Sequence, residues 1–150
     1  MKSRTLMLAG FAVVAIAMVL RAADGVSLEG IKCIMAANKD AKADNAVEYR
    51  GAKVFFCCGN CSKGFAADPA KHAAKANHQL VATKQFTQVK CPISGGPLAD
   101  GTDVKVGGID VKFCCMNCKA KAEKSEDAVS LLFADKSFDK GFEAKKAETK

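Results

Sequence analysis

Two segments of the chain align without a gap: VEYRGAKVFFCCGNC at residues 47–61 and VKVGGIDVKFCCMNC at residues 104–118. In each, apolar and polar residues alternate around a glycine, and then come two adjacent cysteines and a third cysteine. A period of two that is interrupted by glycine predicts a short β-hairpin. The chain therefore contains, twice, a predicted hairpin that leads directly into a Cys-Cys-x-x-Cys cluster.

The repeat includes one further cysteine upstream of each hairpin. The eight cysteines fall into two sets with nearly equal spacing, offset by 57 or 58 residues: Cys33, Cys57, Cys58 and Cys61, and Cys91, Cys114, Cys115 and Cys118. An internal period of this length indicates a duplicated unit, which gives a first module at residues 26–82 and a second at 83–138. Modules of this size have marginal hydrophobic cores, so the cysteines are expected to add stability through a metal or through cross-links.

Helices are predicted to follow each hairpin. Cysteines three or four residues apart share a helical face, and the free N–H groups at a helix start stabilise thiolates. Asp68 and Pro69 predict the start of a second helix that runs to about Val81, and its counterpart is expected to start at Ser125. The predicted fold class is α+β, with Phe55, Phe56, Phe65 and Phe113 in the core, a short strand between the modules at residues 86–89, and a frayed charged tail at 139–150.

A distant cysteine, a hairpin and a cysteine pair at a helix start occur in the order of a treble-clef zinc finger. The segments KCIMA…FFCCGNCSKGFAADPAKH and KCPISGG…KFCCMNCKAKA resemble YHS/TRASH domains, small treble-clef-like modules associated with metal binding. The resemblance covers residues 31–73 and 89–122 and implies two tandem copies. The resemblance implies that the ligands of the first copy are Cys33, Cys57 and Cys61. It implies that those of the second copy are Cys91, Cys114 and Cys118. The second copy lacks the Phe and Asp-Pro that follow the cluster in the first.

The fourth ligand of each predicted site is open. Cys58 and Cys115 are candidates because they occur in both copies, but adjacent cysteines rarely bind one ion without strain, and one of each pair would then be a buried apolar thiol. His72 or His78 could instead complete the first site. Since the two histidines are six residues apart on a helix, they point about 120° apart and do not readily bind one ion together; a half-buried helix position is their other interpretation.

Three chemistries compete for the eight thiols. The first is a thiophilic metal, either zinc or copper(I), and Met35 and Met116 would assist copper(I). The second is a set of disulfides, which an oxidising compartment favours. The third is redox activity of the adjacent pairs, for which the chain lacks a thioredoxin-like context. The helix-start spacing and the family resemblance favour metal.

The N-terminus predicts export. Lys2 and Arg4 precede an apolar run from Leu6 to Leu20, which is short for a membrane span, and small residues follow. We expect a signal peptide at residues 1–25, with a retained membrane anchor as the alternative, and hence a secreted or periplasmic protein. The net charge of +7 comes mainly from dispersed lysines without interleaved aromatic residues, which argues against a nucleic-acid partner.

No catalytic motif is present: the chain lacks a Ser-His-Asp order, a glycine-rich phosphate loop and a glutamate beside the cysteines. The sequence therefore predicts a protein that is not an enzyme and that binds a metal ion for storage, buffering or delivery. The alternative is a structural or interaction module that zinc or disulfides hold together. The sequence identifies no protein partner. Duplication also suggests that the modules pack face to face through their hairpins.

Overall fold

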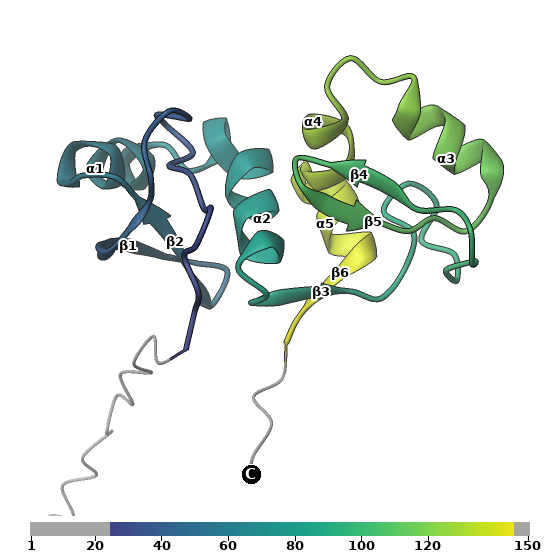
Figure 1. The fold of residues 1–150 in the computed structure, drawn as a ribbon, viewed down its shortest axis with the longest axis horizontal. Helices are drawn as coiled ribbons and strands as arrows, with labels where there is room; N and C mark the ends of the chain where they lie inside the picture. Colours follow the sequence, from purple (N-terminus) through teal and green to yellow (C-terminus); the bar gives the residue numbers. More distant parts are fainter. Residues whose placement is uncertain (1–24, 146–150) are drawn as a thin grey trace, which may run out of the picture.

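The computed structural model describes residues 25–145, and Figure 1 shows two small hairpins, each followed by short helices. The mixed α+β class is confirmed. The predicted signal peptide lies outside the described residues except for Gly25, as do residues 146–150 of the tail. Within the described range, no helix is both long and apolar enough to span a bilayer.

The first hairpin forms where the alternating pattern predicts it. Strands β1 (Lys42–Tyr49) and β2 (Ala52–Phe56) are antiparallel, with Val47 opposite Val54. Arg50 and Gly51 connect them with positive φ angles of 54° and 72°, as in the two-residue turns that match strand twist. The end of β2 is buried on both faces, so this strand delivers the chain to the cysteine cluster from inside the core.

The second hairpin is shorter. It comprises β4 (Val104–Val106) and β5 (Ile109–Val111), joined by Gly107 and Gly108, which both have positive φ angles. Val106 and Val111 point into the core. The repeated sequence pattern therefore gives two hairpins, each with a two-residue turn in which both residues have positive φ angles.

Helices α1 (Gly59–Ala67) and α3 (Met116–Glu123) begin immediately after the adjacent cysteines, as predicted. In the first module, Asp68 and Pro69 lead into a 3-10 turn, η1 (Ala70–His72), and then α2 (Ala73–Ala82). The Asp68 carboxylate accepts a hydrogen bond from the Lys71 N–H at 3.3 Å. The helix that Asp-Pro predicts is therefore present, with a 3-10 first turn.

The start predicted for the corresponding helix of the second module is wrong. The helix α4 (Ala128–Phe133) has Asp127 as its N-cap, and the Asp127 carboxylate accepts from the N–H of Ser130 at 2.9 Å. Ser125 instead closes the end of α3, because its N–H donates to the Ala122 carbonyl at 3.2 Å. Asp127 rather than Ser125 caps the helix because its carboxylate lies directly before the apolar residues of α4.

The prediction of a frayed tail is wrong for residues 139–145. Helix α5 (Asp135–Gly141) continues into β6 (Phe142–Ala144), which pairs antiparallel with β3 (Phe86–Gln88) between the modules. Figure 1 shows β6 beside β3 below the helices. The Phe142 ring stacks on Phe138 and Phe133 at centroid distances of 5.1 and 5.3 Å, and this aromatic burial fixes the charged segment.

The two modules share one core. All four phenylalanines predicted to be buried are at most 1% exposed, and the apolar cluster runs continuously from Phe65 in the first module to Phe138 in the second. Helix α2 packs against α4 and α5. The prediction that the modules meet through their hairpin faces is wrong, because α2 lies between the two hairpins and packs against helices of the second module (Figure 1).

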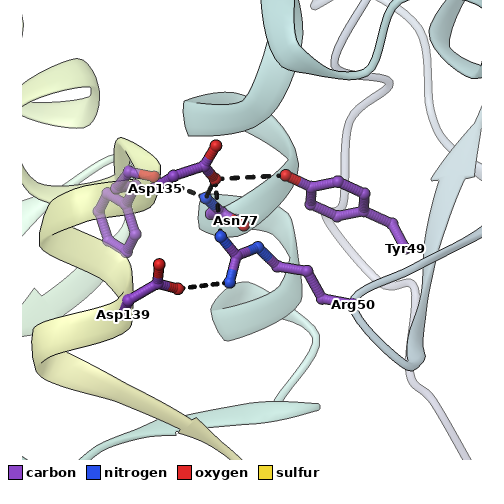
Figure 2. A network of polar contacts seen from close by, with 6 residues as sticks. Tyr49, Arg50, Asn77, Asp135 and Asp139 are labelled. Atoms are coloured by element: carbon purple, nitrogen blue, oxygen red, sulfur yellow. Dashed lines mark hydrogen bonds and ion pairs between the residues drawn. The ribbon is translucent and has the colours of Figure 1, made fainter.

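Polar contacts also cross the module boundary (Figure 2). The side-chain N–H of Asn77 on α2 donates to the Phe133 carbonyl at 2.8 Å and to Asp135 at 3.0 Å. Arg50, at the turn of the first hairpin, donates to Asp135 at 2.8 Å and to Asp139 at 2.5 Å. These contacts fasten the first hairpin to α5.

We expect Arg50→Ala to lower the free energy of unfolding by about 1 kcal/mol, because Asp135 and Asp139 are half-exposed and such pairs are individually weak. High salt should reduce the difference from the unsubstituted protein. Urea denaturation at low and high salt measures both effects. Lys105→Ala is the control, since its pair with Asp110 lies within one exposed hairpin. Equal losses in the two variants would mean that Arg50 does not fasten the modules.

Candidate metal centre

The first cysteine of each set is buried in a tight loop. The Cys33 N–H donates to the Lys39 carbonyl at 2.9 Å, and its carbonyl accepts from Ala36 at 3.2 Å. In the second module, the Cys91 N–H donates to the Gly96 carbonyl at 3.0 Å and its carbonyl accepts from Gly95 at 2.7 Å. Both residues are at most 1% exposed. The loops therefore direct each thiol inward, toward the end of its hairpin.

The remaining cysteines occupy the same positions at each hairpin end. Cys57 directly follows β2, Cys58 is the N-cap of α1, and Cys61 lies in the first turn of that helix. The second module repeats this arrangement at the start of α3, with Cys114, Cys115 and Cys118. The sequence repeat thus corresponds to a repeat in three dimensions.

Three sulfurs converge in each module. All Sγ atoms of Cys33, Cys57 and Cys61 lie within 4.8 Å of one another, and so do those of Cys91, Cys114 and Cys118. We call these groups the first site and the second site. The predicted residues of the family resemblance are therefore brought together, although they come from loops, hairpin ends and helices that are distant in sequence.

The sulfur spacing suits an ion better than a disulfide. The distances from Cys57 to Cys61 and from Cys114 to Cys118 are both 3.7 Å. Thiolates at about 2.3 Å from a tetrahedral ion lie about 3.75 Å apart, whereas a disulfide requires about 2.05 Å. All eight thiols are free in the structure. The two groups could therefore each hold a metal ion.

The polypeptide favours a thiolate at the first cysteine of each site. Burial acts to raise the pKa of the Cys33 thiol, but the N–H groups of Cys57, Met35 and Ala36 point at its sulfur and the net direction is downward. Burial likewise opposes ionisation of Cys91, yet hydrogen bonds from Ser94 and neighbouring N–H groups lower its pKa to about 7. Both shifts favour the thiolate, which is the form of cysteine that binds metal.

The last cysteine of each site behaves in the opposite way. The pKa of Cys61 is raised to about 12 by its hydrogen bond with Cys58 and by burial. Burial and the hydrogen bond with Cys114 raise the pKa of Cys118 to about 12. Because an ion binds thiolates, filling either site must release protons from these groups. Binding is therefore expected to be pH-dependent.

Cys58 and Cys115 lie outside the two groups. Both are exposed, with sulfurs 3.8 Å from Cys57 and 3.7 Å from Cys114, respectively. The pKa of Cys58 falls to about 7, mainly because the Cys61 N–H at the start of α1 donates to its sulfur. A buried apolar thiol was one interpretation of a member of each adjacent pair, and neither Cys58 nor Cys115 fits it because both are exposed. They are solvent-facing thiols at the rim of each site.

Neither group contains a histidine. His72 is half-buried at the end of η1. His78 lies at the module boundary, with Nε2 3.3 Å from the Val106 carbonyl and its ring against Phe133 at 5.0 Å. Burial lowers the His78 pKa, and a side chain on Gly107 would collide with its ring. The half-buried helix position is therefore where the structure places both histidines.

Two glutamines that the sequence analysis missed hold the sites in shape. The Gln79 side chain accepts from the Phe55 N–H at 2.7 Å and donates to the carbonyls of Phe55 and Lys32 at 2.9 and 3.1 Å. It thereby ties the residue before Cys33 to β2, the strand that Cys57 directly follows. No sequence signal singles it out beyond a glutamine on the buried face of a helix.

Gln88 makes the same connection in the second module. Its side chain accepts from the Lys112 N–H at 3.0 Å and donates to the carbonyls of Lys112 and Lys90 at 2.6 and 3.1 Å. These backbone groups occupy the same positions in both modules. Lys90 comes directly before Cys91, as Lys32 does before Cys33, and Lys112 lies two residues before Cys114, as Phe55 does before Cys57. One side-chain amide therefore sets the distance between loop and hairpin in each site, although the two glutamines are not equivalent in the repeat.

The comparisons with known proteins add no relative: the chain matches no family model, no curated protein and no solved structure. The class of site is therefore defined by its own geometry, as two groups of three cysteines that could each hold a metal ion. The YHS/TRASH resemblance rests on the residues quoted above.

Proposed function

We propose that this protein binds two thiophilic metal ions, one in each three-cysteine site, and stores, buffers or delivers them. The observation that carries the proposal is the duplicated group of three sulfurs, with the same 3.7 Å spacing in both copies. A disulfide framework or a catalytic site gives no reason for three sulfurs to converge twice in this way. The proposal includes that the chain is not an enzyme.

Zinc or copper(I) is the proposed ion. Sulfur ligands select both over hard cations such as magnesium, and the 3.7 Å spacing is close to that of a tetrahedral zinc site. Three protein ligands leave a fourth position, which Cys58 or Cys115 at the rim, or an external ligand, would fill. An accessible fourth position is what exchange with another molecule requires.

The shared core favours metal handling over a purely structural role. An isolated module of some 55 residues would need a staple, but here Phe65, Leu80 and Phe133 belong to one continuous core that spans both modules. A larger common core reduces the dependence of the fold on an ion. The alternative, a zinc- or disulfide-stapled interaction module, remains the second candidate because each site joins a loop to a hairpin.

The family and the location form part of the same proposal. The cysteine spacing and the Phe65 and Asp68-Pro69 positions support two YHS/TRASH-like, treble-clef-like modules. The basic and apolar N-terminus supports export to a secreted or periplasmic location, without a nucleic-acid partner. Detection of the processed chain outside the cytoplasm would test the location independently of the metal.

Elemental analysis of protein purified without oxygen is expected to find two zinc or copper ions per chain, with the site thiols protected from alkylation. Chelation should release the ions while the circular dichroism spectrum is largely retained. Unfolding on chelation would support the structural alternative, because binding and folding would then be one equilibrium. Protein that holds no ion and shows no free thiol would reject the proposed function.

A further inference from the structure

We propose that the two sites are unequal, and that the hydroxyl of Ser94 makes the second site the tighter one and the first site the more readily exchanged one. This inference rests on the proposed metal binding. Its basis is a hydrogen-bonding group that the second site has and the first lacks.

The Ser94 hydroxyl lies against the second site. Its Oγ is 3.1 Å from the Sγ of Cys114. The Gly96 N–H donates to the same Oγ at 3.1 Å. With a protonated Cys114 either atom could be the donor, but a thiolate that binds an ion has no proton, so the hydroxyl must then donate to the sulfur. Ser94 thus acts as a donor toward the ligands of the second site.

The distance distinguishes a donor from a ligand. An oxygen at about 2.1 Å and a sulfur at about 2.3 Å on one tetrahedral ion would lie about 3.6 Å apart. The observed 3.1 Å is shorter and matches a hydrogen bond to sulfur. Ser94 is therefore a positioning residue that acts through Cys114.

The equivalent residue of the first site is Ala36. The N–H groups of Met35 and Ala36 point at the Cys33 sulfur, just as those of Ile93 and Ser94 point at Cys91. Ala36 and Ser94 thus hold corresponding positions after the first cysteine, although the loops close differently: the Cys33 carbonyl accepts from Ala36 and the Cys91 carbonyl from Gly95. The alanine methyl group cannot donate, so the thiolates of the first site lack the bond that the second site has.

The expected consequence is an order of loading. A hydrogen-bond donor holds a coordinating sulfur in place and offsets the repulsion between the thiolates that converge on one ion. Groups in this position typically change metal affinity by about 10- to 100-fold. The second site should therefore fill first and the first site should exchange faster.

Competition titration of the reduced, metal-free full chain with cobalt(II) and zinc tests this. Cys33→Ser isolates the second site and Cys91→Ser isolates the first. We expect Ser94→Ala to weaken the isolated second site by about tenfold or more and to alter the thiolate-to-cobalt absorption. Ser94→Thr, which keeps the hydroxyl, should restore affinity to within about threefold.

Two comparisons keep the test specific. Ser94→Ala made in the Cys91→Ser background should leave the affinity of the first site unchanged, and Ala36→Ser should tighten that site. Equal affinities of the two sites, or a Ser94→Ala variant that binds as tightly as its parent, would overturn the inference and leave the proposed function standing. Failure of the unsubstituted chain to bind cobalt or zinc would instead reject the proposed function.

Discussion

Cys33→Ser is expected to reduce the bound ions from two per chain to one. Cys33 is the buried member of the first site, and its loss leaves only the sulfurs of Cys57 and Cys61. Structural zinc sites bind with about 10–16 kcal/mol, so one ligand of three or four accounts for about 3 kcal/mol or more. That corresponds to a loss of more than about a hundredfold in affinity. Elemental analysis and competition titration measure it.

Cys58→Ser is the matched control, because it removes a thiol from the same module. Cys58 is exposed and is not part of the group of three sulfurs. We expect the Cys58→Ser variant to retain two ions. If Cys58→Ser lost an ion as Cys33→Ser does, Cys58 would be an essential fourth ligand. If Cys33→Ser kept both ions, the three-sulfur group would not be the binding site.

The local features of this fold could be predicted from the sequence because each has a short-range cause. Alternation around Arg50 and Gly51 gives a hairpin whatever the rest of the chain does. The spacing of Cys57 and Cys61 places both thiols on one helical face. Helix spacing does not place Cys33 or Cys91 beside these thiols; the family resemblance implied that step, and the structure brings the three sulfurs together in each module.

The features that were missed depend on contacts between distant segments. The β6 strand pairs with β3 across more than fifty residues of chain, and its only sequence signal is Phe142, a single aromatic residue among charged ones. The start of α4 was misplaced because Ser125, Glu126 and Asp127 are all acceptable at a helix start. Only the packing of Leu132 and Phe133 in the core decides between them.

Gln79→Ala is expected to damage both the stability of the fold and the first site. Gln79 is 3% exposed, and its loss leaves the buried N–H and carbonyl of Phe55 without partners. Each such group costs about 1–3 kcal/mol, so we expect the free energy of unfolding to fall by about 3 kcal/mol. The Lys32 carbonyl is also released, so the loop that carries Cys33 is no longer tied to the hairpin.

Affinity at the first site should then fall by about tenfold or more, as is typical when a group that orients a ligand is removed.

Gln85→Ala is the matched control. The Gln85 side chain accepts from the Lys53 N–H at 2.8 Å and donates to the Lys53 carbonyl at 2.7 Å, on the same strand, but it does not contact the Cys33 loop. It should cost about 1 kcal/mol, because these groups are half-buried and water can replace the amide, and it should leave metal affinity unchanged. Gln88→Ala should weaken the second site instead. All three variants remove a side-chain amide that bonds to a strand backbone. If Gln79→Ala weakens only the first site and Gln88→Ala only the second, the amides position the ligands. General destabilisation would not give this site-specific pattern. Equal effects of Gln79→Ala and Gln85→Ala on the first site would show that only the stability of the strand matters.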